Sequence, residues 1–284
     1  MKNVGYYNGR ICPLEELMIP ALDRAVYLGD SIYEYILVRN KKPFAFGDHL
    51  DRFFKCCSEM RFPLTFDRAQ LTAISEETIG YADDDAEYHV LYLQSSRGTG
   101  MRSHSFPPDT VAPNLLIMVT PSSFVSVHEP MKVQTIEDKR TLFCHLKTTN
   151  LIPAVFAAQS AKENNCQESI FCRGNIVTDA SHSGVGILKD GVLFTHPLNN
   201  LILHSTSRIH VLKCCADAGL PVDETPFTKD SLKSADEVLI WSTPYLCRRV
   251  SHINGEPVGG KAVELAAEAI LQPYYDRMIK ETNI

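Results

Sequence analysis

The sequence predicts an α+β fold in two halves, and three observations support that prediction. Strand-like apolar stretches occur in both halves of the 284-residue chain and are separated by Asn-Gly and Asp-Gly turn signals. Helical stretches with recognisable ends lie between those strands. The stretch 121–130, PSSFVSVHEP, is polar, bounded by proline and without periodicity, which is typical of a connection between domains. We therefore expect an N-terminal α+β domain, an interdomain connection and a C-terminal α+β domain over 1–120, 121–130 and 131–284.

In the first half, Asn8-Gly9 is a hairpin signal, and the stretch IYEYILV at 32–38 has the composition of a strand. An amphipathic helix is expected to begin at Gly47-Asp48. A second helix is expected near 67–80. Two further strands are expected at EYHVLYLQSS and NLLIMVT, which occupy 87–96 and 114–120.

In the second half, Pro153 suits the first turn of a helix, and Gly219 suits the end of another helix near 207–218. Asp190-Gly191 and Asn254-Gly255 are turn signals between strands. The remaining strands are expected in SIFCRGNIVTD, VGILKDGVLFT and EVLIWST, which occupy 169–179, 185–195 and 237–243, and a helix is expected to follow the last hairpin.

The composition excludes several classes of protein. A hydrophobic fraction of 44% and a net charge of -6 describe an ordinary soluble globular protein, with no basic excess that would favour nucleic acid as a partner. The longest apolar runs, such as LLIMV, are too short to cross a bilayer. The first ten residues, MKNVGYYNGR, lack the apolar core of a signal peptide. We expect a cytoplasmic protein without a membrane partner.

The nine cysteines do not form a recognisable metal or redox motif. Their number is odd, two adjacent pairs occur at Cys56-Cys57 and Cys214-Cys215, and no CxxC is present. We therefore expect reduced thiols in the core and no metal site.

Lys147 is the first candidate for chemistry. It lies in CHLKTTNLIPAVFAAQ, and no Asp, Glu, Lys or Arg occurs near it between Arg140 and Lys162. A lysine amine attacks an aldehyde only in its neutral form, which desolvation or a neighbouring cation favours. The alternative is a lysine whose stem packs while its ammonium group reaches water.

Seven segments resemble the fold-type IV pyridoxal-phosphate enzymes in order and spacing, and among them the D-amino-acid (D-alanine) aminotransferases. These segments are LDRAVYLGDSIYEYI, KPFAFGDHLDRF, SSRGTGMRSHSFP, HLKTTNLIPAVFAAQSAKENN, RGNIVTDASHSGV, THPLNNLILHSTSR and EVLIWSTPYL. The resemblance covers almost the whole chain. It implies bound pyridoxal 5'-phosphate, a two-domain α+β fold with the active site at the domain boundary, and a homodimer.

The resemblance also assigns cofactor contacts residue by residue. Lys147, in the C-terminal domain, matches the lysine that forms a Schiff base and carries the substrate proton. Asp179 matches the carboxylate at the pyridine nitrogen, where the family usually has glutamate. The phosphate contacts match Arg52, Thr206, Ser207, Ser242 and Thr243, and Leu203 matches the apolar side chain on the ring face.

Each of these residues also has an ordinary structural alternative. Arg52 would pair with Asp48 on an exposed helix face, and Asp179 would cap the turn that follows it. The serines and threonines would cap helices or turns, and Leu203 would be a core residue. Pro244 departs from the family pattern because it removes a backbone N–H beside Thr243.

Substrate binding is assigned to the loop that contains RGTGMRSHS. Arg102 and His104 match residues that reach from the neighbouring subunit in D-amino-acid aminotransferases and bind the substrate carboxylate together with a tyrosine, here Tyr33. The alternative is an exposed loop with a solvated arginine. Tyr35 is another departure, since many relatives have a small branched residue at that position.

The implied function is transfer of an amino group from a D-amino acid, such as D-alanine, to a 2-oxo acid, such as 2-oxoglutarate, by a ping-pong mechanism. Two activities on the same fold remain as alternatives, an L-branched-chain aminotransferase and a 4-amino-4-deoxychorismate lyase. An alternative of another class is a protein that binds the cofactor without turnover, which Asp179 and Pro244 motivate.

Overall fold

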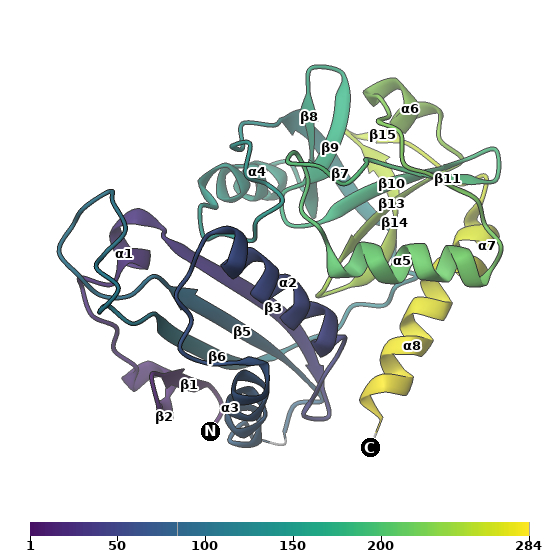
Figure 1. The fold of residues 1–284 in the computed structure, drawn as a ribbon. Helices are drawn as coiled ribbons and strands as arrows, with labels where there is room; N and C mark the ends of the chain where they lie inside the picture. Colours follow the sequence, from purple (N-terminus) through teal and green to yellow (C-terminus); the bar gives the residue numbers. More distant parts are fainter. Residues whose placement is uncertain (84, 284) are drawn as a thin grey trace. The chain divides into compact units, whose positions relative to one another are not determined.

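The computed structural model describes residues 1–83 and 85–283, which divide into two compact units. The first unit comprises Met1–Phe124, Leu146–Asn150 and the last residues from Lys280, and the second comprises Val125–His145 and Leu151–Ile279. Figure 1 shows helices and strands in both, so the predicted α+β class is confirmed. None of the helices in the described part of the chain combines the length and the apolar character needed to span a membrane.

The first unit contains an antiparallel six-stranded sheet with the order β2-β1-β6-β5-β3-β4. Its strands are β1 (Val4–Tyr7), β2 (Arg10–Pro13), β3 (Ser31–Arg39), β4 (Lys42–Pro43), β5 (Tyr88–Ser96) and β6 (Asn114–Ser122). The expected hairpin forms because Asn8 and Gly9 adopt φ values of 45° and 94°, which a tight turn between β1 and β2 requires. The other elements are η1 (Leu14–Glu16), α1 (Arg24–Leu28), α2 (Phe46–Glu59) and α3 (Arg68–Gly80).

One face of this sheet forms the core of the first unit. Side chains alternate along a strand, so Ile32 and Ile36 of β3 point to the same face. There they join a buried cluster with Leu50 and Phe53 of α2 and with Leu71 of α3. Both helices therefore cover this face, and the odd-numbered side chains of β3 lie on the opposite face.

The second unit contains a nine-stranded sheet with the order β12-β11-β10-β13-β14-β7-β8-β9, and β15 pairs with β14. Its strands are β7 (Met131–Glu137), β8 (Glu168–Arg173), β9 (Ile176–Ala180), β10 (Gly184–Lys189), β11 (Val192–Thr195), β12 (Val222–Asp223), β13 (Glu237–Ser242), β14 (Leu246–Ile253) and β15 (Glu256–Pro257). The helices are α4 (Ile152–Glu163), α5 (Thr206–Asp217), α6 (Lys229–Ser234), α7 (Val263–Ala266), the π-helical turn η2 (Ala267–Leu271) and α8 (Gln272–Thr282).

The units and strands differ from the expected ones. The last residues from Lys280 are counted with the first unit, although the C-terminal domain was expected to extend over 131–284. The segment that contains Lys147 is counted with the first unit, although it was expected in the C-terminal domain. The physical reason is its attachment to β3, because Tyr33 N donates to the Lys147 carbonyl at 3.0 Å. Strand β6 continues to Ser122, inside the stretch expected as a connection, and strand β7 was not expected at all.

The cysteines lie mainly in the interior. Within the described residues all nine are free thiols, and seven of them are buried. Burial in apolar surroundings raises the pKa of the Cys215 thiol to about 12 and the pKa of the Cys172 thiol to about 11. These thiols are therefore protonated and weakly nucleophilic at neutral pH.

The core of the second unit includes a tryptophan that packs against two glycines of the neighbouring strand. Trp241 of β13 is 1% exposed, and its ring lies over Gly184 and Gly186 of the paired strand β10. A Cβ atom built on Gly186 would lie 2.7 Å from the Trp241 ring and 3.0 Å from the Phe194 carbonyl oxygen. Glycine is therefore required at this position for the two strands to pack.

Gly186→Ala should lower the free energy of unfolding by about 1–3 kcal/mol, because the added methyl group forces a buried ring and a backbone carbonyl to move. Urea unfolding followed by Trp241 fluorescence measures the change. The matched control is Gly80→Ala at the exposed end of α3, where an added Cβ meets no atom within 4 Å. Equal stability of the two variants would contradict the packing described here.

Candidate active site

Lys147 is fixed next to β3 by its own backbone. Its carbonyl accepts from Tyr33 N at 3.0 Å, and Thr149 N donates to the Ser31 carbonyl at 3.3 Å. The Lys147 ammonium nitrogen lies 4.2 Å from the centroid of the Tyr33 ring. The ring therefore faces a cation at a distance where its quadrupole attracts positive charge. Two of the predicted site residues are thus brought together within the first unit.

Tyr33 belongs to a group of aromatic residues on the sheet face opposite α2. Its ring stacks on Tyr92 of β5, with the centroids 5.5 Å apart. Tyr35 pairs directly with Tyr92 in the strand register. Tyr35, the residue noted as a departure from the family pattern, therefore lies on the same face as Tyr33 and next to it.

Arg52 does not have the exposed position that its structural alternative required. It is 8% exposed, and its guanidinium donates to the buried Glu34 carboxylate through Nε at 2.7 Å and Nη2 at 2.6 Å. The His49 Nδ1 atom also lies 2.7 Å from the same carboxylate. Glu34 is on β3, and both partners are on α2, so the three side chains join the sheet to the helix.

The charges of this group depend on one another. Burial alone would raise the pKa of Glu34, but the Arg52 charge and hydrogen bonds, together with the His49 hydrogen bond, lower it to about 2. Burial lowers the pKa of His49, which the neighbouring Arg52 and Lys147 charges reinforce and Glu34 opposes. At neutral pH the group therefore contains a carboxylate and a guanidinium, with a neutral imidazole.

Glu34 and His49 were not among the predicted site residues. The signal for Glu34 was present, because IYEYILV contains one acidic residue in an otherwise apolar strand. A carboxylate at a core-facing strand position requires a cation as partner, and Arg52 is the cation that supplies it.

The loop that follows β5 has a fixed base and an exposed tip. At the start of the loop, Asp30 accepts from Arg24 Nε at 2.8 Å and from Arg97 Nε at 2.9 Å. In its middle, the Ser103 carbonyl accepts from Arg24 Nη1 at 2.8 Å. The Arg97 guanidinium carbon lies 3.8 Å from the centroid of the Phe106 ring. These contacts hold the loop against the body of the first unit at Arg97, at Ser103 and at Phe106.

Arg102 and His104 lie at the tip of that loop. Both side chains are exposed, and neither makes a hydrogen bond or ion pair with the residues that the structure describes. The structure therefore does not bring them together with Tyr33 inside the first unit.

In the second unit, Asp179 lies in β9 and is 6% exposed. Its Oδ2 atom accepts from Arg140 Nη1 at 3.1 Å and from Leu203 N at 3.2 Å. Burial raises its pKa to about 6, although Arg140 and the Leu203 amide oppose that increase. Among the predicted residues, Asp179 and Leu203 are thus brought together, and Asp179 is not simply a cap of the following turn.

Thr206 and Ser207 form the first turn of α5, and both are 3% exposed. The capping side chain is Ser205, whose hydroxyl accepts from Arg208 N at 3.3 Å. Plain capping therefore explains neither predicted residue. The first amides of a helix have no partner within the helix and carry a partial positive charge, which favours an anion.

Ser242 lies at the end of β13 and is 5% exposed. Its Oγ atom is buried and lies close enough to the Tyr245 hydroxyl to oppose the rise in the pKa of that group, but it makes no hydrogen bond of good geometry with the described residues. Thr243 begins the turn into β14 and is half-buried, with Pro244 next to it. A buried hydroxyl without a partner is destabilising, so it is a feature expected where a ligand supplies the partner.

The comparison with known proteins identifies the family. Residues 31–253 match the family described as amino-transferase class IV. The chain belongs to the class IV aminotransferases. It is 34% identical over 283 residues to the D-alanine aminotransferase of Staphylococcus aureus strain MSSA476, covering 98% of this chain and 99% of that protein. It is 31% identical over 283 residues to the D-alanine aminotransferase of Bacillus licheniformis, covering 97% of each.

Solved structures of class IV aminotransferases confirm the predicted fold type. The branched-chain aminotransferase of Escherichia coli aligns with a TM-score of 0.86 and 19% identity, covering 100% of this chain and 97% of that one. The branched-chain aminotransferase of Thermoproteus uzoniensis aligns with a TM-score of 0.84 and 19% identity, covering 98% and 94%. At this identity the likeness establishes the fold and says nothing of the substrate.

Glu34→Gln should destabilise this aminotransferase by about 3 kcal/mol near neutral pH, because Arg52 would keep its charge without a counter-ion. The folded-state pKa of Glu34, about 2, lies below its ordinary value of 4.5. Its stabilising contribution is therefore complete above pH 4.5 and is lost as the pH falls toward 2. Urea unfolding across that pH range should show that the free energy of unfolding falls more steeply with decreasing pH in the wild type than in the variant.

The control for this prediction is Glu59→Gln. Glu59 lies 3.9 Å from Lys55 on α2, and both side chains are substantially exposed. Removing one charge from such a pair changes stability by less than about 1 kcal/mol. If both variants lost the same stability, the buried pair would not have the role given to it here.

Proposed function

We propose that this enzyme transfers the amino group of a D-amino acid, such as D-alanine, to a 2-oxo acid, such as 2-oxoglutarate, with pyridoxal 5'-phosphate as cofactor. The observation that carries the proposal is the full-length similarity to D-alanine aminotransferases, at 34% identity. The branched-chain aminotransferases that share the fold are only 19% identical to this chain. Their similarity therefore gives no support for branched-chain amino acids as substrates of this enzyme.

The residues present fit such a cofactor. A phosphate needs hydrogen-bond donors, which the start of α5 and the buried Ser242 hydroxyl offer within the second unit. It also needs positive charge, and we assign the Arg52 guanidinium of the first unit to that role. A pyridine nitrogen needs an acidic partner, which the buried Asp179 supplies. We assign Leu203 to the ring face and Thr206, Ser207 and Thr243 to the phosphate.

In the proposed mechanism, the bound cofactor withdraws the electron pair that remains when the substrate Cα loses its proton. The Lys147 amine would take that proton from the substrate Cα and would carry it to the carbon of the cofactor that receives it. Its fixed backbone at β3 and the Tyr33 ring hold the amine in one direction. Asp179 holds a proton on the ring nitrogen, which strengthens the electron withdrawal.

Arg102 and His104 are assigned to the substrate carboxylate, together with Tyr33, and they act from the neighbouring subunit. The Cα–H bond has to point at the Lys147 amine for proton transfer. The side on which the carboxylate is bound therefore decides which enantiomer presents its hydrogen to that amine. Their exposed position at the loop tip agrees with a contact outside their own unit.

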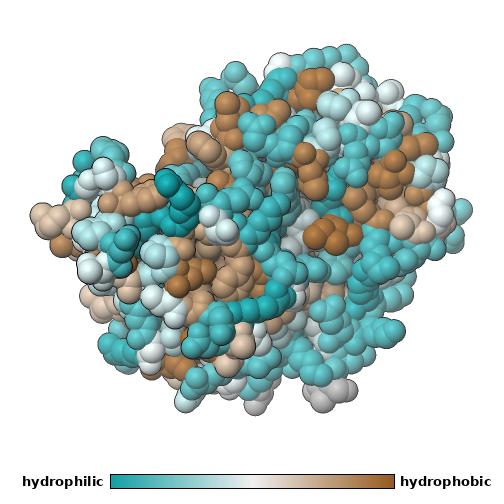
Figure 2. All heavy atoms as spheres, viewed as in Figure 1, coloured by the Kyte–Doolittle hydropathy of each residue, from teal (hydrophilic) through white to brown (hydrophobic). Residues whose placement is uncertain are grey.

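The proposed assembly is a homodimer. Apolar side chains emerge from the hydrophilic surface in separate groups, as the face in Figure 2 illustrates. On α4 and the segment before it, Phe156 is 72% exposed and Phe143 is 65% exposed, with Ile152 and Val155 also exposed. A second copy of the chain would cover such side chains, which are unfavourable in water. The nine free thiols support the cytoplasm as the location.

A coupled assay of D-alanine against L-leucine, with 2-oxoglutarate as acceptor, tests the proposed function. D-alanine should be the better substrate, and Lys147→Ala should abolish turnover because the proton carrier is lost. Borohydride should attach the cofactor covalently to the wild type and not to the variant, as intact mass measures. Lys162→Ala on α4 is the control and should behave as the wild type.

The outcomes of this assay separate the alternatives. Preference for L-leucine would favour the branched-chain aminotransferase, and release of pyruvate from 4-amino-4-deoxychorismate would favour the lyase. A protein that binds the cofactor and turns over none of these substrates would favour the non-catalytic alternative. Full activity of Lys147→Ala would overturn the assignment of the lysine.

Arg102→Ala should raise the Michaelis constant for every amino-acid substrate, with a loss in kcat/KM of about 2 kcal/mol, because a charged donor to the carboxylate is removed. His104→Ala should have a smaller effect in the same direction. Steady-state kinetics with D-alanine measures both, and Arg10→Ala on the exposed end of β2 is the control. Unchanged kinetics in both loop variants would contradict the assignment of the carboxylate site.

A further inference from the structure

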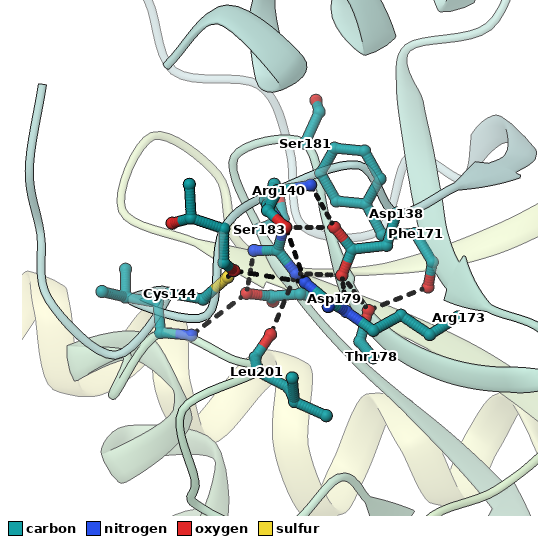
Figure 3. Close-up of polar contacts among 12 residues, drawn as sticks. Asp138, Arg140, Cys144, Phe171, Arg173, Thr178, Asp179, Ser181, Ser183 and Leu201 are labelled. Atoms are coloured by element: carbon teal, nitrogen blue, oxygen red, sulfur yellow. Dashed lines mark hydrogen bonds and ion pairs between the residues drawn. The ribbon is translucent and has the colours of Figure 1, made fainter. Parts of the chain in front are cut away.

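Arg140 is a largely buried arginine, with its side chain 16% exposed, that the proposed mechanism does not use. Its guanidinium carries hydrogen bonds on all three nitrogens. Nε and Nη2 donate to the two oxygens of Asp138 at 3.0 and 3.1 Å, and Nη2 also donates to the Leu201 carbonyl at 3.1 Å. Nη1 donates to Asp179 Oδ2 at 3.1 Å. Figure 3 shows the guanidinium between the two carboxylates.

Asp138 keeps the guanidinium from moving. Its buried carboxylate also accepts from Arg173 Nε at 3.0 Å and from Thr178 Oγ1 at 3.0 Å. The guanidinium carbon of Arg140 lies 4.6 Å from the centroid of the Phe171 ring, which limits movement in that direction. The orientation of Arg140 toward Asp179 is therefore determined from three sides (Figure 3).

Asp179 depends on this arginine in two ways. The hydrogen bonds from Arg140 and Leu203 both end on Oδ2, and the neighbouring Ala180 amide also stabilises the carboxylate. Neither Arg140 nor Leu203 therefore contacts Oδ1. Burial raises the pKa of Asp179 to about 6 even with Arg140 in place. Removal of the guanidinium would raise it further and leave a neutral carboxyl at neutral pH.

We propose that Arg140 is a positioning residue for the reaction, which holds Asp179 as an anion and directs Oδ1 toward the ring nitrogen of the cofactor. This inference rests on the proposed assignment of Asp179 to that nitrogen. Aspartate has one methylene less than the glutamate usual in the family, about 1.5 Å of reach. A shorter side chain has fewer torsions to adjust, so a fixed donor on Oδ2 determines where Oδ1 lies.

The experiment uses the enzyme reconstituted with pyridoxal phosphate labelled with 15N in the ring. In wild type at neutral pH, the 15N signal should lie at the position of a protonated pyridine. In Arg140→Gln it should shift toward the unprotonated position, and the half-reaction with D-alanine should slow by about 10- to 100-fold. Arg140→Lys keeps the positive charge but lacks the planar set of guanidinium N–H donors, so it should give an intermediate shift. It also provides a second variant if glutamine prevents folding.

Arg173→Gln is the matched control. Arg173 donates to Asp138 and to the Arg140 carbonyl but makes no hydrogen bond with Asp179 among the described contacts. A purely structural network would respond to both arginine substitutions alike, through stability alone. An unshifted 15N signal in both Arg140 variants, or an equal shift in Arg173→Gln, would overturn the proposal.

A further variant separates this proposal from the assignment on which it rests. Asp179→Asn should shift the 15N signal at least as far as Arg140→Gln. If Asp179→Asn left the signal at the protonated position, the assignment of Asp179 to the ring nitrogen would fail. If the Arg140 variants kept the 15N signal at the protonated position while Asp179→Asn shifted it, the positioning role of Arg140 would fail and the assignment of Asp179 would stand.

Discussion

The Glu34 carboxylate is fully buried under α2, where an unpaired charge would cost several kcal/mol. Its pairing with Arg52 therefore determines where α2 lies on the sheet, since both guanidinium contacts have to form together. Asp138 has the same effect in the second unit, because the donors around it fix Arg140 and through it Asp179. In both units, the proposed cofactor residues are positioned by a buried carboxylate that itself takes no part in the chemistry.

Local signals in the sequence were sufficient for most of the secondary structure. The turn at Asn8-Gly9 and the helix that starts beside Pro153 were predicted because each depends on the backbone preferences of one or two residues. The helix over Arg68–Gly80 has a capping box at Asp67, which is likewise a local feature. Strand β7 escaped prediction because KVQTIED has mixed polarity, and its pairing with β8 and β14 is decided far away in the chain.

The site residues show the same difference between features that depend on local sequence and features that depend on distant contacts. Lys147 and Asp179 were assigned to the site from motif resemblance and remain predictions, and the arrangement around them was not predicted. Arg140 lies in EDKRT, whose four charged residues resemble a solvated turn, and yet Asp138 and Arg140 are largely buried because their charges pair with each other and with β8 and β9. Such pairing depends on tertiary contacts, and no local pattern in one sequence indicates which charges are buried.

In the loop after β5, the contacts that hold the loop in place are separate from the side chains that are proposed to bind the substrate. The loop is held by Arg24, Asp30 and Arg97, which form ion pairs with one another and a hydrogen bond to a backbone carbonyl of the loop. The exposed side chains of Arg102 and His104 contribute none of these contacts, although the Ser103 carbonyl between them accepts from Arg24. Substitutions at the tip therefore leave the scaffold intact, while substitutions at the base alter the position of every tip residue at once. With the proposed role of Arg102 and His104 in substrate binding, a change of substrate at these two positions would not carry the loss of stability that usually accompanies new function.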